Sequence, residues 1–540
     1  MYLLENPVLQ RELLVNLRMT RAFVLLFFYV ALLGGVVFLA WPQQKQLDLT
    51  TNPEAAKRLV NLLFLGQYLL ASLMAPSFAA GAISGEKERR SYEMLLASPL
   101  RPGAIVLGKL LASLCHLAIL IFASLPIVML CLPLGGVSPY EVLAAYLALI
   151  LSVVTFGMIS LSCSSYFKRT SSSLVVAYLL ILPLALVGAA MWQVLESAGE
   201  VRLIATVTVL PVICAAIGLP LFFTTSRRLL YPPDVGSEGK EVVDLDQEAH
   251  EVVGLIIRRD QFPDRLFAPA KRETLLPDGA NPVYDKELRS EVFSQGTLML
   301  RVVIQVSMLL AIPLMAICLY LWPELSGWYI SYVVLFNMLV GPVFSAGSLT
   351  SERERETLDL LLTTILSPWQ ILWAKLVCGL RVSSVLTMFL LWPLALACIM
   401  VNYFWSNLHI VLAYLAIVLI TCVTTATVAL FCSVFFRKTS ISLMTTYLVI
   451  VVLFTAPVAM TFFAQTFFPT ARLSGIIAAG SFTSPFAVAF GLPIDMGMPS
   501  SKIVTNWPLF GAYVAYSVFL NGALLATMVW LFNTRWRVTE

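Results

Sequence analysis

The sequence has little charge. Of its 540 residues, 12% are Asp, Glu, Lys or Arg, whereas ordinary soluble domains carry about 25%. Hydrophobic residues make up 59%, and the mean hydropathy is +0.87. This composition predicts a membrane protein that crosses the bilayer several times. The net charge of +4 is too small and too scattered to indicate nucleic-acid binding.

Sequence motifs for nucleotide binding and for enzymatic catalysis are also missing. The nearest string to a phosphate-binding loop, around Gly239-Lys240, has Asp234 in place of the leading Gly and Glu241 in place of Ser or Thr. The chain is therefore not expected to hydrolyse ATP by itself. It has no Gly-x-Ser-x-Gly elbow and no His-Glu-x-x-His string, so an intramembrane enzyme is disfavoured.

Metal and redox chemistry are not indicated either. The nine cysteines lie in or at the ends of apolar runs without a Cys-x-x-Cys pair, and the three histidines are far apart in sequence. We expect no disulfide, no metal site and no cofactor.

Acidic residues are absent from the interiors of the long apolar runs. Carriers driven by an ion gradient usually place carboxylates at membrane depth, so this class is disfavoured. Arg381 is the one basic residue well inside an apolar run, and we expect its side chain to snorkel to the inner surface.

About twelve apolar runs are present, six in each half. An apolar run of about 20 residues is long enough to cross some 30 Å of hydrocarbon. The runs cover roughly residues 22–41, 60–83, 106–133, 141–163, 173–192 and 203–224, then 299–322, 328–349, 371–400, 409–434, 441–464 and 510–532. The expected fold is an all-α polytopic membrane protein with about twelve transmembrane helices. Its expected division is a first six-span half at 1–225, a linker at 226–280 and a second six-span half at 281–540.

Three matching stretches indicate that the halves are copies. Glu86 and Glu352 lie in equivalent charged patches 266 positions apart (352 − 86), Thr170 and Thr439 are 269 apart (439 − 170), and Asn6 and Asn281 are 275 apart (281 − 6). Nearly constant offsets are expected of a duplicated unit with small loop insertions. Since each half has an even number of spans, both should be the same way up, as parallel repeats.

Basic residues predict the orientation. They collect in the loops on the side of the N-terminus and are scarce in the other loops, which places both termini and both charged patches in the cytosol. We expect a multi-pass protein of the plasma membrane. In the outer loop at 465–509, the uncharged stretch from Gly475 to Pro493 is expected to form a helix that dips into the outer leaflet.

The repeated charged patch has two readings. It can be a solvated turn that ends the second span, with acidic residues favouring a helix N-terminus. However, paired leucines follow the charges in both copies, at Leu95-Leu96 and Leu361-Leu362. A short helix of this kind can be an interfacial anchor, a docking element for a partner, or both, and we favour docking.

The patch resembles a known family. The string from Ser84 to Lys109 and its echo from Thr350 to Lys375 look like the cytosolic loop of type-2 ATP-binding-cassette (ABC) permeases, with Glu-x-Glu, a Leu-Leu pair, a Pro and a Lys that opens the next span. The Asn-Pro-Val strings at Asn6 and Asn281, each followed by a basic-Glu-Leu triplet, are similar to the first helices of larger permeases of the same group. The resemblance covers both halves outside the linker and the long outer loop.

The resemblance implies a function and a set of site residues. The chain would be the membrane part of an exporter that is driven by separate cytosolic ATPase subunits, two copies of which would bind one fused chain. The residues implied to couple to the ATPase are Glu86, Glu88, Arg89, Glu93, Leu95, Leu96, Glu352, Glu354, Arg355, Asp359, Leu361 and Leu362. The interfacial elbow helices would contain Arg11, Glu12, Leu13, Lys286, Glu287 and Leu288, in contact with membrane lipid. The substrate is not identified, and a membrane scaffold that docks an ATPase or a maturation factor without transport is the alternative.

Overall fold

The computed structural model describes residues 6–17, 20–40, 53–88, 91–132, 137–167, 170–195, 199–230, 281–289, 297–354, 356–467, 472–494 and 505–535. Within these ranges the chain forms helices and no strand. The all-α polytopic fold is thus confirmed. The chain divides into two compact units, unit 1 at Met1–Val242 and unit 2 at Val243–Glu540.

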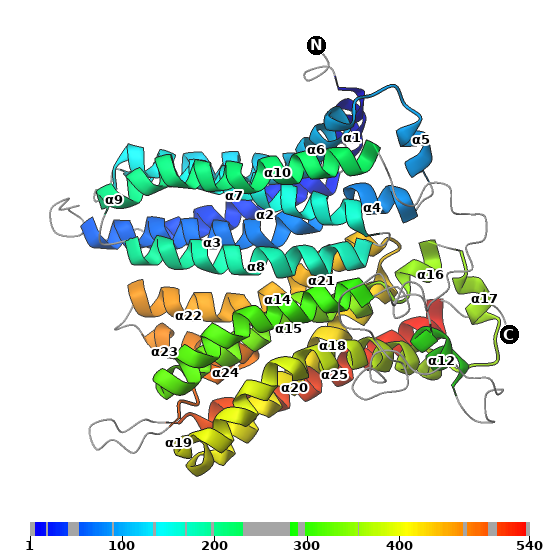
Figure 1. The fold of residues 1–540 in the computed structure, drawn as a ribbon. Coiled ribbons are helices and arrows are strands. Elements are labelled where there is room, and N and C mark those ends of the chain that lie inside the picture. The colour runs from blue at the N-terminus through cyan, green and yellow to red at the C-terminus, as the bar shows by residue number, and fades with distance from the viewer. Residues whose placement is uncertain are drawn as a thin grey trace. The chain divides into compact units, whose positions relative to one another are not determined.

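Unit 1 begins with the short helix α1, which precedes the first apolar helix (Figure 1). Its helices are α1 (Pro7–Leu17), α2 (Thr20–Ala40), α3 (Pro53–Ala79), α4 (Gly81–Glu88), α5 (Tyr92–Leu96), α6 (Pro102–Met129), α7 (Pro139–Tyr166), α8 (Thr170–Val194), α9 (Gly199–Ile204), the π-helix η3 (Ala205–Val209) and α10 (Leu210–Leu230). Because α10 ends at Leu230, residues 226–230 of the predicted linker are helical. Residues 231–280 lie outside the described residues.

Unit 2 follows a similar order. Its helices are α12 (Pro282–Arg289), α14 (Thr297–Met315), η5 (Ala316–Leu321), η6 (Pro323–Leu325), α15 (Ser326–Ala346), α16 (Thr350–Glu354), α17 (Leu358–Leu362), α18 (Pro368–Met400), α19 (Asn402–Ser406), α20 (Leu408–Phe435), α21 (Thr439–Ile450), η7 (Val451–Thr455), α22 (Ala456–Phe467), α23 (Arg472–Gly480), η8 (Ser481–Thr483), α24 (Pro485–Phe490) and α25 (Trp507–Arg535).

Ten helices in the described part of the chain are long and apolar enough to cross a membrane. Two shorter apolar helices, Tyr29–Phe38 and Gln305–Leu321, lie where the first span of each half is expected. In α15, 83% of the apolar stretch is buried inside the protein, whereas the figure for α10 is 6%. The apolar surface of α10 is therefore largely exposed, while α15 lies in the core of its unit.

Matching tyrosine contacts hold the second long helix of each unit. The Tyr178 hydroxyl of α8 donates to the Leu73 carbonyl of α3 at 2.7 Å, and the Tyr447 hydroxyl of α21 donates to the Leu339 carbonyl of α15 at 2.6 Å. Both carbonyls lie three residues before a proline inside the helix, directly after the carbonyl that has no amide donor because the proline lacks an N–H. The tyrosine steadies the helix at this weak turn.

The long outer loop of unit 2 contains the short helices α23 and α24. Here the Ser484 hydroxyl donates to the Phe454 carbonyl at 2.5 Å, and the Tyr414 hydroxyl of α20 donates to the Leu492 carbonyl at 2.5 Å. These bonds tie the loop to η7 and α20. Its predicted depth in the membrane stays a prediction.

Candidate functional site

The charged patch of each unit forms short helices at one end of that unit. We call residues 81–96 (α4 and α5) the first loop segment and residues 350–362 (α16 and α17) the second loop segment. In each unit the loop segment lies at the same end as the elbow helix, α1 in unit 1 and α12 in unit 2 (Figure 1). The sequence folds this way because each segment follows one long apolar helix and precedes the next, which starts at Pro102 or Pro368.

Each elbow helix starts with an asparagine whose side chain makes two hydrogen bonds. In α1 the Asn6 side-chain oxygen accepts from the Val8 amide at 3.0 Å, while its amide group donates to the Ala104 carbonyl of α6 at 2.6 Å. In α12, Asn281 makes the same pair of bonds, to the Val283 amide at 3.0 Å and to the Gln370 carbonyl of α18 at 2.8 Å. An asparagine cap followed by proline is a favoured helix start. Here the asparagine also bonds the elbow helix to α6 in unit 1 and to α18 in unit 2.

A buried serine holds the start of each loop segment. The Ser164 hydroxyl oxygen of α7 accepts from the amides of Ile83 and Ser84, at 3.0 and 2.8 Å. The Ser433 oxygen of α20 accepts from the amides of Leu349 and Thr350, at 3.0 and 3.1 Å. Amides in the first turn of a helix lack intrahelical partners, so one serine satisfies two of them inside the protein.

The charges next to this serine turn inward. The Lys87 ammonium donates to the Ser165 carbonyl at 2.6 Å, and the Arg353 guanidinium donates to the Val434 and Phe436 carbonyls at 2.6 and 2.7 Å. These carbonyls belong to the ends of α7 and α20, where unpaired carbonyls and the helix dipole favour a cation.

Two glutamates cap the helices that follow. A Glu88 carboxylate oxygen accepts from the Thr170 amide at 2.8 Å at the start of α8, and Glu354 accepts from the Thr439 amide at 3.1 Å at the start of α21. A carboxylate at a helix N-terminus is stabilised by the free amides and by the dipole. The second glutamate of each Glu-x-Glu motif thus joins its loop segment to α8 in unit 1 or to α21 in unit 2.

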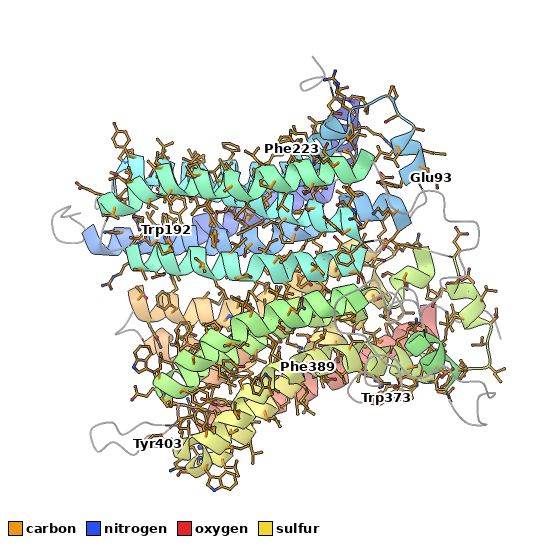
Figure 2. All side chains as sticks on the ribbon, viewed as in Figure 1. Glu93, Trp192, Phe223, Trp373, Phe389 and Tyr403 are labelled. Carbon is orange, nitrogen blue, oxygen red and sulfur yellow. The ribbon has the colours of Figure 1, made fainter. Side chains whose placement is uncertain are left out.

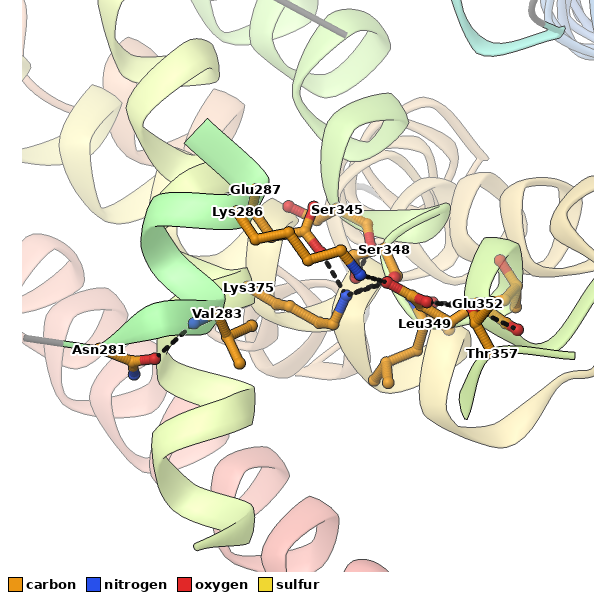
Figure 3. Close-up of polar contacts among 12 residues, drawn as sticks. Asn281, Val283, Lys286, Glu287, Ser345, Ser348, Leu349, Glu352, Thr357 and Lys375 are labelled. Carbon is orange, nitrogen blue, oxygen red and sulfur yellow. Dashed lines mark hydrogen bonds and ion pairs between the residues drawn. The ribbon is translucent and has the colours of Figure 1, made fainter. Parts of the chain in front are cut away.

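The other glutamate of each motif belongs to an ion cluster around a buried lysine. We call Lys286, Glu287, Glu352 and Lys375 the second ion clamp (Figure 3). The Lys375 ammonium is fully buried and lies 2.6 Å from Glu287 Oε1, 3.6 Å from Glu352 Oε1 and 2.8 Å from the Ser348 carbonyl. Lys286 of the elbow adds a contact of 2.9 Å to Glu352 Oε1. The clamp therefore joins α12, α16 and α18.

Glu352 is held in its ionised form. Burial alone would raise its pKa, but hydrogen bonds from Thr357 and Lys286, together with the charges of Lys375 and Lys286, outweigh burial and lower the pKa from 4.5 to about 2. The carboxylate therefore stays charged at neutral pH, and its negative charge holds the elbow against the loop segment.

Unit 1 has a corresponding cluster of Glu12, Glu86 and Lys109, which we call the first ion clamp. The Lys109 ammonium lies 3.3 Å from Glu86 Oε1 and 3.7 Å from Glu12 Oε1. Lys109 comes from α6, Glu86 from α4 and Glu12 from α1, so the three elements correspond to those of the second clamp. The elbow residue Arg11 is exposed.

The outward faces of α5 and α17 carry an acidic residue beside an apolar one. Glu93 and Asp359 are exposed, and so are Met94, by 80%, and Leu360, by 70%. Figure 2 shows Glu93 on α5, at the end of unit 1 that lies away from α9. Glu93 and Asp359 belong to the predicted coupling residues, whereas Met94 and Leu360 are exposed neighbours that the prediction did not include.

The other predicted residues have different surroundings. Leu95, Leu96, Leu361 and Leu362 are half-buried, and the last two pack against a cluster around Leu358. Leu13 is half-buried. Arg89, Arg355 and the side chain of Leu288 lie outside the described residues. The structure thus brings Glu86, Glu88, Glu352 and Glu354 together with partners in their own unit, and it leaves Glu93 and Asp359 at the surface.

Sequence reasoning missed the inner partners. Lys109 and Lys375 entered only as the end of a motif, although a lysine at matched places inside two apolar helices is itself a signal of a paired charge. Arg381, expected to snorkel to the inner surface, donates to the Tyr284 hydroxyl of the elbow helix at 3.3 Å. Ser164 and Ser433 lie in the matched stretches that are 269 positions apart, but nothing in the sequence indicated that their hydroxyls accept from the loop segments.

A search for metal sites gives no candidate. Among the described residues no group of three or more His, Cys, Asp or Glu side chains could hold a metal ion.

The fold and this site define a multi-pass helical membrane protein with a charged, helix-bearing end. Residues 7–200 match the family model described as ABC-2 family transporter protein. The match spans most of unit 1 and none of unit 2, and it agrees with the resemblance found in the sequence. A permease of this family is the membrane component of an ABC transporter, associates with ABC ATPase subunits and is generally not catalytic itself. No curated protein matches the chain.

Proposed function

We propose that the chain is the permease of an ABC exporter and that α5 and α17 are the coupling helices on which its ATPase subunits dock. The observation that carries this proposal is the set of matched polar contacts that tie α4 and α16 to three other elements of their unit, while the Ser91 and Thr357 amides, just before α5 and α17, donate to the Glu86 and Glu352 carbonyls. A force applied to α5 or α17 reaches the elbow helix through the ion clamp, the core through Ser164 or Ser433, and the next long helices through Glu88 or Glu354.

This arrangement divides the coupling residues into two groups. Glu93, Met94, Asp359 and Leu360 are accessible and would contact the ATPase. An exposed apolar side chain beside a carboxylate fits a partner groove with an apolar floor and a basic rim, in which a few buried contacts supply most of the affinity. The inward glutamates would transmit movement and would not contact the partner.

Two docking helices in one chain support the binding of two ATPase copies. The matching contacts of the two units favour an origin by duplication of one six-span unit. On this proposal both docking helices and both termini face the cytosol of a cell with the protein in its plasma membrane. ATP binding would close the ATPase pair, push on both loop segments and shift the long helices to move an as yet unidentified substrate outward.

The test is co-purification from native membranes in mild detergent, with ATP hydrolysis measured in the eluate. Met94→Asp and Leu360→Asp each place a carboxylate in the proposed contact. The matched control is Trp405→Asp on α19, since Trp405 is 68% exposed and lies at the opposite end of unit 2. We expect ATPase activity with the wild type and with the control, and its loss from the double loop variant.

Two results would count against the proposal. Retention of the ATPase by the double loop variant would remove the docking role of α5 and α17. Retention of the ATPase by the wild type without ATP-dependent export from reconstituted vesicles would favour the scaffold alternative.

A further inference from the structure

The two ion clamps differ in charge and in distance. In unit 2 two cations face two carboxylates, with contacts of 2.6 and 2.9 Å at their shortest. In unit 1 Lys109 alone contacts two carboxylates, at 3.3 and 3.7 Å. Arg11 occupies the place of Lys286 and stabilises the ionised Glu86 by its charge, but from beyond ion-pair distance. The second cation of the second clamp is in direct contact with a carboxylate, and the contacts of this clamp are shorter.

The carboxylates of the second clamp are also less exposed, although its outer cation, Lys286, is 60% exposed. The side chains of Glu352 and Glu287 are 11% and 20% exposed, whereas those of Glu86 and Glu12 are 24% and 33% exposed. Water and salt screen exposed ion pairs and weaken them. The same contacts thus resist separation more strongly in unit 2.

An apolar anchor adds to the difference. At the first position of α17, Leu358 is 5% exposed and packs in a core cluster with Leu349, Leu372 and Leu376. The equivalent position in α5 is Tyr92, which is half-buried under the Lys87 ammonium at 5.4 Å from the ring centre. No residue of α5 is buried. Helix α17 is anchored in the core of unit 2 through Leu358, whereas α5 lies on the surface of unit 1.

Further bonds occur at the ends of the second loop segment. Helix α18 begins with a capping box, in which the side chains of Ser367 and Gln370 each accept from the other residue's backbone amide. In α6 the N-cap residue is Arg101, and its side chain makes no capping hydrogen bond. The bond from Arg381 to Tyr284 ties the elbow of unit 2, and the position equivalent to Arg381 in unit 1 is Cys115 (381 − 266).

Other contacts are equal in the two units and exclude a general difference in packing. Ser164 and Ser433 hold the starts of the segments at similar distances, and Asn6 and Asn281 pin the elbows alike. The difference is confined to the connection between elbow, loop segment and docking helix.

From these contacts we infer that the two docking helices are held unequally, so that α5 opens locally more readily than α17 and the ATPase binds unit 2 more tightly than unit 1. A preordered helix loses less conformational freedom on binding than one that must be ordered by its partner. The order of affinity rests on the proposed function, whereas the difference in local opening is a property of the chain alone. In the transporter the first loop segment would then be the adaptable one and the second the rigid one.

Hydrogen exchange of the full-length protein in nanodiscs, without any ATPase, tests the difference in opening. We expect the amides of residues 92–97 to exchange at least tenfold faster, after correction for intrinsic rates, than those of residues 358–363. The reciprocal variants Tyr92→Leu and Leu358→Tyr exchange the anchors. Tyr92→Leu should slow exchange in α5, and Leu358→Tyr should speed it in α17.

Equal protection of the two helices in the wild type, or greater protection of α5, would overturn the inference. This outcome does not depend on docking, because no partner is present in the experiment. The affinity order is tested separately by the single variants of the co-purification. Leu360→Asp should remove more ATPase than Met94→Asp, and the reverse order would refute it.

Discussion

Replacement of Lys375 by methionine isolates the contribution of the second ion clamp. Methionine keeps most of the volume of the side chain and removes its charge. Two carboxylates, 2.6 and 3.6 Å from the ammonium, lose their common cation, and the Ser348 carbonyl loses a donor. Each ion pair is worth a gross attraction of about 4–6 kcal/mol at an effective dielectric constant of 20.

The net cost is smaller because the buried ammonium no longer has to be desolvated. Removal of one partner from a buried pair typically costs about 3–5 kcal/mol, since the other charge stays unpaired in the interior. We expect a loss in this range for Lys375→Met. For Lys109→Met we expect about 1–2 kcal/mol, because the carboxylates of the first clamp are exposed enough to be hydrated.

The assay is SDS-induced unfolding in mixed micelles, followed by tryptophan fluorescence. The double variant Lys375→Met/Glu287→Gln serves as the internal control. It leaves Glu352 paired with Lys286 at 2.9 Å and should recover about half of the loss. An equal cost of Lys375→Met and Lys109→Met, or no recovery in the double variant, would refute the assignment of Lys375 as the centre of the clamp.

Two further predictions concern the second loop segment. The pKa of Glu352 is lowered from 4.5 to about 2, so its contribution to stability should be constant above about pH 4.5 and should disappear as the pH falls toward 2. The unfolding free energies of wild type and Glu352→Gln measure this, and a difference that already shrinks at pH 6 would contradict it. Glu356 has a φ of 59°, in the left-handed region, and it follows α16 in a turn where the Thr357 amide donates to the Glu352 carbonyl. Because glycine takes this conformation without strain, Glu356→Gly should stabilise the protein by about 0.5–1 kcal/mol in the same assay, whereas Ser351→Gly inside α16 should destabilise it.

The positions of the long helices follow from local sequence. An apolar run must satisfy its backbone hydrogen bonds internally in lipid, and only a helix does so within one segment. The prolines at 102 and 368 and the asparagines at 6 and 281 mark helix starts by their own backbone chemistry, so the sequence predicts them too. At residues 29–38 and 305–321 the same reasoning predicts full-length spans, whereas the apolar helices there are shorter.

The charged motif is the opposite case. Its composition predicts a surface helix, and this holds for Glu93 and Asp359, which are exposed. The pattern gave no means to separate these outward carboxylates from Glu86 and Glu352, which look the same in sequence. Their partners lie 23 residues away in both units, at Lys109 and Lys375.

The amino-acid sequence by itself determined the membrane class, the helical segments, the matching patches and the resemblance to type-2 ABC permeases, because each depends on local composition, spacing or order along the chain. Which charges face inward, by contrast, depends on how distant parts of the folded chain pack together. Whether a carboxylate is desolvated and paired depends on elements far apart in sequence that pack together, such as α12, α16 and α18 around Lys375. The same holds for the inequality of the two clamps, since small differences in distance and exposure, invisible in two similar strings, change the strength of an ion pair several-fold.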